Sequence, residues 1–256
     1  MTYALSDSAA MFQRNMTHLR RNPTAIMVSV LIPVFLLLLF VGVFRALGQA
    51  ATTGGGDYID YLVPGILLMT IAYGVQSTTL AVNQDMTEGV IQRFRTMAIA
   101  PSSVMTGHVL AAVIRTLVSV ALVLGVSLAL GFRPDAGPLE WLAVLGIVTL
   151  MTLALAWLSV AVGLAAPTVD STGGFLIIIQ LLPFISSAFV PTETMSGAVR
   201  WFASNQPFTV MIDAIRALFS GAPVGSDGWV SVAWSVGLTL AGYVWARRAF
   251  RRIRVR

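Results

Sequence analysis

Long apolar stretches dominate the chain, and short polar connections separate them. A helix of about 20 apolar residues is long enough to cross roughly 30 Å of hydrocarbon. Six stretches reach this length, and they run over about Thr24–Phe44, Tyr61–Val82, Val104–Phe132, Leu139–Ala165, Gly173–Val190 and Trp229–Ala246. The pattern therefore predicts an all-α membrane protein with six transmembrane helices.

The polar sequence between these stretches is too short for a separate soluble domain. We expect one transmembrane domain over residues 1–256, with a six-span core at 24–246 and a basic tail at 247–256. Before the core, apolar residues recur at helical spacing at Leu5, Ala9, Phe12, Met16 and Leu19. This stripe predicts an amphipathic interface helix at 1–23. A cleaved signal peptide is the alternative, but its apolar region would be only about 7–15 residues long.

The segment Pro191–Gly221 mixes apolar residues with charges and a proline. It favours short outer re-entrant helices between spans five and six rather than a further full span. Asp213 and Arg216 lie three residues apart and can pair on one helix face. With Trp201 and Pro207 they form our candidate extracellular gate.

Composition agrees with a membrane location. Hydrophobic residues make up 57% of the chain and charged residues 11%, against about 25% charged in soluble domains. All 16 basic residues are arginine, and they favour one orientation. With a cytoplasmic N-terminus, four lie outside, at Arg45, Arg133, Arg200 and Arg216, and most of the rest lie inside. The positive-inside rule then predicts that both termini are cytoplasmic. The net charge of +5 is explained by this topology, without nucleic acid.

Several classes of chemistry are disfavoured. The chain has no cysteine and two histidines, which predicts no metal site. A nucleophile motif of the G-x-S-x-G kind is missing, so we expect no catalytic residues. A P-loop of the form G-x-x-x-x-G-K-[ST] needs a lysine, and the chain has none. A transport role fits better than an enzyme.

Polar residues inside the spans are candidates for helix contacts or for function. His108 and Arg115 share one face of the third span. Arg115 can snorkel, pair with a neighbouring helix, or serve function, since intramembrane charge is costly. We place Gln76, Gln180, Phe184 and Ser187 along a substrate pathway, while helix packing is the alternative role for such residues.

A polar segment, Asn83–Pro101, separates the second and third spans and lies on the arginine-rich side. It predicts a short helix at about 84–100 with an apolar ridge at Val90, Phe94 and Met97. Charged residues of both signs surround the ridge. A helix resting on lipid headgroups is the alternative, which the acidic residues disfavour.

Five motifs in order along the chain resemble the permease subunit of ABC-2 type exporters, particularly the daunorubicin-resistance branch of drug-efflux permeases. They are Arg21-Asn22-Pro23 with Pro33-Val34, the run Tyr58–Leu67, Asp85–Gly89 with Arg93-Phe94-Arg95, Val190–Met195, and Gln206–Thr209 with Arg216-Ala217-Leu218. The chain departs from the family at Met195-Ser196-Gly197, where Met-Pro is common.

The resemblance implies a six-span permease in a bacterial plasma membrane. It implies a dimer with a second copy or a related permease, and docking of two copies of an ATP-binding subunit that holds ATP and Mg²⁺. It also implies that the segment at 84–100 is the coupling helix seated on that subunit. The residues assigned to this coupling are Asp85, Glu88, Gly89, Val90, Arg93, Phe94 and Arg95.

The expected cargo is an amphipathic drug or natural product. A lipid or polysaccharide precursor is the alternative within the same machinery. A stand-alone secondary transporter is a different class, and it would need paired acids within its spans. The central parts of the six stretches carry no Asp or Glu, which disfavours that class.

Overall fold

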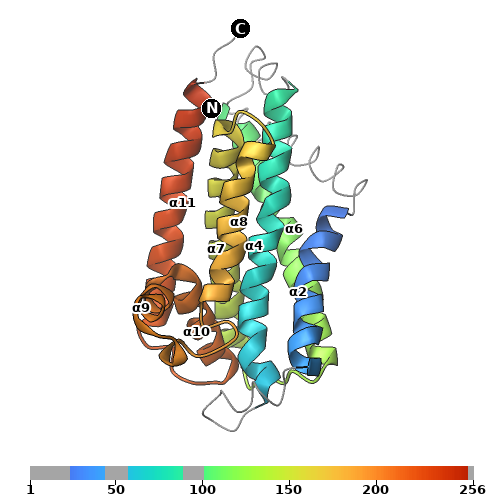
Figure 1. The fold of residues 1–256 in the computed structure, drawn as a ribbon, viewed down its shortest axis with the longest axis vertical. Helices are drawn as coiled ribbons and strands as arrows, with labels where there is room; N and C mark the ends of the chain where they lie inside the picture. The colour runs from blue at the N-terminus through green and yellow to red at the C-terminus, as the bar shows by residue number, and fades with distance from the viewer. Residues whose placement is uncertain (1–23, 44–56, 89–100, 253–256) are drawn as a thin grey trace.

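Five long helices lie side by side in the computed structural model, which describes residues 24–43, 57–88 and 101–252 (Figure 1). They are α2 (Thr24–Val43), α4 (Tyr58–Thr87), α6 (Pro101–Ala129), α7 (Pro138–Ala165) and α11 (Asp227–Arg252). Every regular element among the described residues is a helix, which confirms a helical membrane protein. The end of α4, the start of α6 and the end of α11 lie at one end of the bundle.

Four of these helices, α4, α6, α7 and α11, are long and apolar enough to cross a membrane. Two shorter apolar stretches, Met27–Val43 and Asp170–Ile185, occupy the places of the first and fifth expected spans. The count of six spans stays a prediction, as does the side on which the termini lie.

The fifth apolar stretch is broken rather than continuous. It begins with η1 (Asp170–Thr172) and α8 (Gly173–Leu181), and then tightens into the 3₁₀ turn η2 (Leu182–Ile185). Pro183 lies in this turn, where it has no N–H to continue the α-helical ladder. The sequence predicts one span over Gly173–Val190, but the α-helix ends at Leu181.

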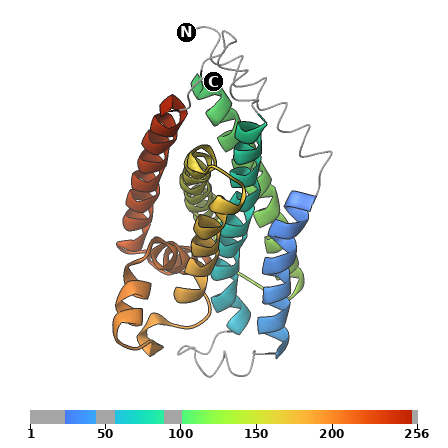
Figure 2. The ribbon, with the colours of Figure 1, turned by 45° about the horizontal axis from the view of Figure 1, so that its top comes forward.

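Short helices gather at the end of the bundle opposite the end of α11 (Figure 2). They are η3 (Thr192–Thr194), α9 (Gly197–Asn205) and α10 (Pro207–Phe219). These are the short helices that the mixed segment Pro191–Gly221 predicts, and their re-entry into the outer leaflet stays a prediction.

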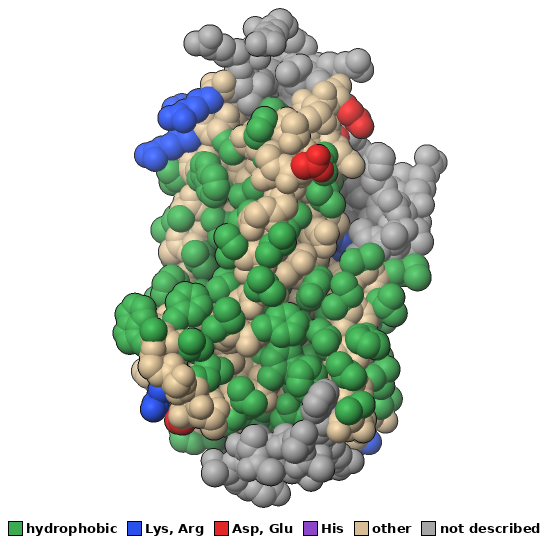
Figure 3. Space-filling model, in the orientation of Figure 1, with side chains coloured by type: hydrophobic (Ala, Val, Ile, Leu, Met, Phe, Trp, Pro, Cys, Tyr) green, Lys and Arg blue, Asp and Glu red, His purple; other side chains and the backbone are tan. Residues whose placement is uncertain are grey.

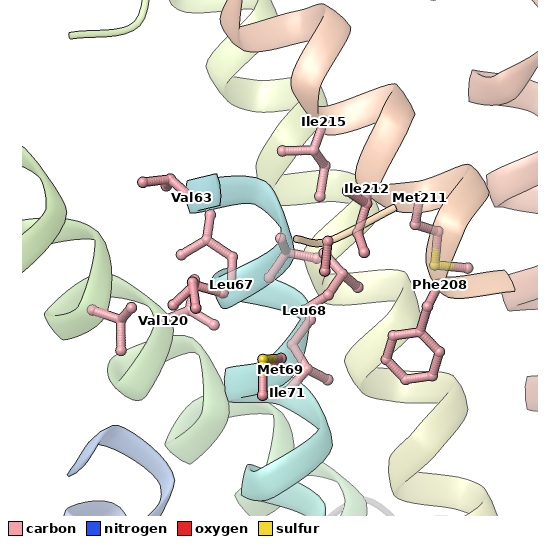
Figure 4. Packing of buried hydrophobic residues seen from close by; sticks show 14 of the residues in the cluster. Val63, Leu67, Leu68, Met69, Ile71, Val120, Phe208, Met211, Ile212 and Ile215 are labelled. Atoms are coloured by element: carbon pink, nitrogen blue, oxygen red, sulfur yellow. The ribbon is translucent and has the colours of Figure 1, made fainter. Parts of the chain in front are cut away.

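Helix α4 forms the centre of the bundle. In its most apolar window 83% of the residues are buried, against 22% in α11, so α11 is peripheral. Val63, Leu67 and Leu68 of α4 pack in one cluster with Val120 of α6 and Ile212 of α10 (Figure 4). This cluster joins the short helices to the long ones, so α4 contacts both.

Two boundaries differ from those that the sequence predicts. Helix α4 continues through Thr87, so residues 84–87 are the last turn of the second span and not the start of a separate helix. Helix α11 runs to Arg252, so the basic tail begins inside a helix. Residues 89–100, the rest of the expected coupling helix, lie outside the described residues, as does the expected interface helix at 1–23.

Candidate functional site

The side chains of Asp213 and Arg216 on α10 form the ion pair that their spacing predicts. Arg216 Nη1 donates a hydrogen bond to Asp213 Oδ1 at 2.5 Å. Ser187 Oγ donates to the same carboxylate oxygen at 2.8 Å. Ser187 follows the break after α8, so the carboxylate of Asp213 connects α10 to the chain beyond the broken helix.

Arg216 also reaches the beginning of α4. Its guanidinium carbon lies 3.8 Å from the centre of the Tyr61 ring, a cation–π geometry. Its Nη2 donates to the backbone oxygens of Tyr61, at 3.2 Å, and of Ser187, at 2.8 Å. The Tyr61 hydroxyl donates to Ser187 O at 2.9 Å. We call Tyr61, Ser187, Asp213 and Arg216 the outer cluster.

Gln206 satisfies the carbonyls that the break in the fifth stretch leaves free. Its Nε2 donates to Leu182 O at 3.1 Å and to Ile185 O at 2.6 Å. Freed carbonyls inside a membrane protein need such partners, because lipid offers none. Pro207 then begins α10 at a position where its missing N–H costs nothing.

The other expected gate residue does not join the outer cluster. Trp201 lies on α9, and 72% of its side chain is exposed. Of the four expected gate residues, Asp213 and Arg216 therefore contact each other. Pro207 begins their helix, and Trp201 is exposed.

Two of the four expected pathway residues contact each other. Gln180 Nε2 on α8 donates to Gln76 Oε1 on α4 at 3.1 Å. Phe184 lies against Phe189, with ring centroids 5.3 Å apart, and Ser187 belongs to the outer cluster. The two glutamines have the interhelical hydrogen bond that is typical of packing residues, and the pathway role stays a prediction.

Arg115 pairs with a neighbouring helix. Its Nη2 donates to Thr78 Oγ1 of α4 at 2.6 Å and to Gly74 O at 3.4 Å, and only 9% of the side chain is exposed. A Cβ at Gly74 would lie 2.8 Å from Thr116 Oγ1. Glycine therefore permits the close approach of α4 and α6 at the level of this hydrogen bond.

The last two turns of α4 are fixed to both neighbouring helices. Asn83 Nδ2 donates to Gly163 O at 3.1 Å and to Ala166 O at 2.8 Å, at the end of α7. His108 Nε2 of α6 lies 3.2 Å from Asp85 Oδ2. We call Asn83, Asp85 and His108, together with the two carbonyls that Asn83 binds at the end of α7, the inner clamp.

The inner clamp adjoins the expected coupling segment. Glu88 is exposed and follows the last residue of α4, with its N–H donating to Gln84 O at 2.9 Å. Of the other coupling residues, Asp85 belongs to the clamp. Gly89, Val90, Arg93, Phe94 and Arg95 lie outside the described residues.

Metal chemistry has no support in this part of the chain. Within residues 24–43, 57–88 and 101–252, no three His, Asp or Glu side chains gather as metal ligands would. The clusters instead join helices to one another, through Arg216 at the end that carries the short helices and through Asn83 at the other end.

Comparison with known proteins identifies the family. The family model described as "ABC-2 type transporter" matches residues 8–220, which is most of the chain. The chain belongs to the ABC-2 type transporter family. The resemblance seen in the five sequence motifs is confirmed.

Relatives of this ABC-2 chain are named as transport permeases. It is 28% identical over 238 residues to the "Daunorubicin resistance ABC transporter permease protein DrrB1" of Streptomyces coeruleorubidus, covering 93% of this chain and 80% of the relative. It is 24% identical over 239 residues to the "Probable doxorubicin resistance ABC transporter permease protein DrrC" of Mycobacterium tuberculosis, covering 93% and 86%. These names agree with a membrane subunit that is not itself an enzyme.

Three contact residues of this ABC-2 member escaped the sequence reasoning as site residues. Tyr61 lies in the Tyr58–Leu67 motif, and Gln206 begins the motif that continues with Pro207, so each motif held a usable signal. Asn83 is the first polar residue after the second apolar stretch. A polar residue at the boundary between a span and its connection can hydrogen-bond a neighbouring helix, and this was the usable signal for Asn83.

Proposed function

We propose that the chain is the transmembrane permease subunit of an ABC exporter that is powered by a separate ATP-binding subunit. The ABC-2 family match over residues 8–220 carries this proposal. The absence of lysine supports it, because a lysine P-loop would have to come from another chain. ATP and Mg²⁺ would be held by that partner.

An amphipathic drug or natural product is the cargo that the relatives favour. Two of them are named for resistance to daunorubicin or doxorubicin, and each aligns with 93% of this chain. The exposed apolar side chains of α2 and α8 provide the hydrophobic surface that such a cargo would meet, for example Leu31, Phe35, Ile177 and Ile178. We place the chain in a bacterial plasma membrane, as a homodimer with two ATP-binding subunits.

Coupling would run through α4. This helix has 30 residues, so at about 1.5 Å per residue it is about 45 Å long. One of its ends carries the inner clamp and leads into residues 88–100, the remaining part of our coupling segment. The other end carries Tyr61 of the outer cluster. Movement of the ATP-binding subunit would displace α4 together with α6 and α7, because the clamp joins the three helices.

The outer cluster would act as the extracellular gate. Arg216 connects α4, α10 and the chain after the broken helix through four hydrogen bonds and a ring contact. Displacement of α4 by a few ångströms would break these contacts together. Rigid-body movements that repack an interface are a common form of switching in proteins.

The orientation follows from the arginine distribution. Arg247, Arg248, Arg251 and Arg252 lie at the end of α11, at the same end of the bundle as the inner clamp. By the positive-inside rule this end is cytoplasmic, where an ATP-binding subunit would dock.

Co-expression with a candidate ATP-binding subunit, sought first in the reading frames beside this one, tests the proposal. We expect the two to co-purify, and reconstituted complex to hydrolyse ATP faster when a transported drug is added. Phe94→Asp and Glu88→Arg should weaken co-purification if residues 84–100 dock on the partner. A complex that never forms, or export that continues without ATP, would contradict the proposal.

A further inference from the structure

A groove of about 650 Å³ opens where α4, α7 and α11 end. Both α4 and α11 pack along α7, and the groove lies between their ends. Its lining residues are Met86, Thr87, Leu164, Ala165, Ala166, Pro167, Trp245, Arg248, Ala249 and Arg252. The volume falls within the range of about 300–1,000 Å³ that is typical of small-molecule sites.

The groove combines an apolar wall with a cationic one. Met86 of α4 and Leu164 of α7 form the apolar side of the groove. Trp245 of α11 precedes the two arginines on the same helix. Arg248 and Arg252 are exposed and lie four residues apart, so they share one face of α11. Neither forms a hydrogen bond or ion pair with a described residue.

The charge of the groove is of one sign. Among the described residues, its lining contains two arginines and no Asp or Glu. Figure 3 shows arginine side chains at the end of α11, and the acidic side chains visible at this end of the molecule lie apart from them. An anionic ligand would therefore meet two guanidinium groups that have no partner among the described residues, and guanidinium groups bind phosphate oxygens well.

We propose that this groove binds an anionic phospholipid of the cytoplasmic leaflet. The phosphate would lie between Arg248 and Arg252, and an acyl chain would lie along Met86, Leu164 and Trp245. A phospholipid carries both chemistries in one molecule, and basic pockets between helices at this level of a membrane suit lipid headgroups. Trp245 is the residue type that is enriched at the membrane–water interface. The inference uses the orientation proposed above and assigns the lipid a role apart from cargo.

The position of the groove gives such a lipid a structural role. Met86 and Thr87 lie in the last turn of α4, next to the inner clamp and just before residues 88–100. A bound lipid would fill the space between this turn and the end of α11. Anionic lipid would thus stabilise the arrangement of helix ends at which we propose that the ATP-binding subunit docks.

Native mass spectrometry of the purified chain tests the proposal with dioleoyl phosphatidylglycerol and dioleoyl phosphatidylcholine. We expect a clear preference for phosphatidylglycerol. Arg248→Gln combined with Arg252→Gln should weaken its binding about thirty-fold. Arg247→Gln combined with Arg251→Gln is the matched control: it removes the same charge from the same two turns but leaves the groove lining intact. The control should bind as the unaltered chain does.

Three results would overturn the proposal. Equal losses in both double variants would show a diffuse attraction to the basic helix end, and equal binding of the two lipids would exclude an anion site. The chain has no cysteine, so Ala249→Cys offers one thiol in the groove. Phosphatidylglycerol vesicles should protect this thiol from maleimide. Efficient cross-linking of it to a cysteine placed within residues 1–23 would show that the chain itself fills the groove. These assays need neither ATP nor cargo, so they are independent of the export proposal.

Discussion

Arg216 of α10 stacks on the ring of Tyr61 of α4, with its guanidinium carbon 3.8 Å from the ring centre. The two residues are 155 positions apart in sequence, and this contact joins the central helix to the short helix α10. The same guanidinium donates to two backbone oxygens and to Asp213. The planar shape of arginine is what allows one side chain to make all these contacts.

Replacing Arg216 by lysine should destabilise the outer end of the bundle while keeping its charge. Lysine cannot stack on Tyr61 and donate to three oxygens in fixed directions, so we expect a loss of about 1–3 kcal/mol. Arg200→Lys is the control, since Arg200 is exposed on α9. Thermal unfolding in detergent measures the difference. Equal unfolding midpoints for the two variants would mean that the cluster is not a structural connection.

Gly163→Ala should destabilise the chain. A Cβ at this position would lie 2.8 Å from the backbone oxygen of Thr79, which cannot move independently of α4. Overpacking of this kind costs about 1–3 kcal/mol. Gly146→Ala in the same helix is the control, because a Cβ there has no atom within 4 Å. That variant should be neutral or about 0.5–1 kcal/mol more stable. A harmless Gly163→Ala would show that α4 and α7 do not approach this closely.

Asn83→Ala should separate ATP hydrolysis from export. The substitution removes two hydrogen bonds that join α4 to the end of α7, while Glu88 and the docking segment stay unchanged. We expect the ATP-binding subunit to bind normally and export to fall about tenfold, within the usual range of coupling free energies. Asp170→Ala is the control, because Asp170 is exposed in η1 just beyond the end of α7 and belongs neither to the clamp nor to the coupling segment. Reconstituted vesicles give both rates. Full export by the Asn83→Ala variant would show that the inner clamp has no role in coupling.

Glu88→Arg should weaken association with the ATP-binding subunit. Glu88 is exposed directly after α4. Reversing a charge at the rim of an interface slows association and disturbs the alignment of the two partners. Glu193→Arg, at another exposed site beyond α8, serves as the control at the other end of the molecule. Co-purification yield at low and high salt measures the effect, which should shrink as salt rises. Equal yields for both variants would place docking elsewhere.

Local patterns predicted the parts of the fold that depend on neighbours in sequence. The length of each apolar stretch located α4, α6, α7 and α11, and the i, i+3 spacing located the pair of Asp213 with Arg216. Apolar length is a poor guide to where a helix ends, because helix formation does not require apolar residues. Helix α4 therefore continues through polar residues to Thr87, beyond the expected end at Val82.

Contacts between distant segments could not be predicted. The choice of Tyr61 and Ser187 as partners of Arg216 depends on how α10 lies against α4, which no local spacing encodes. Pro183 is a local cause of the break in the fifth stretch, but the break also depends on Gln206, whose amide donates to the freed carbonyls from 21 and 24 residues away. Asn83 likewise acts through carbonyls at the end of another helix.

Locking the outer cluster tests most directly whether it opens during export. The chain has no cysteine, and Ser187 Oγ lies 2.8 Å from Asp213 Oδ1, so cysteines at these two positions can be joined by a short thiol-reactive reagent with a cleavable link. The measurement is drug export by reconstituted Ser187→Cys/Asp213→Cys complex before and after cross-linking, and again after cleavage of the link. Our account predicts that the cross-linked complex hydrolyses ATP without exporting drug, and that cleavage restores export. Undiminished export by the cross-linked complex would contradict it.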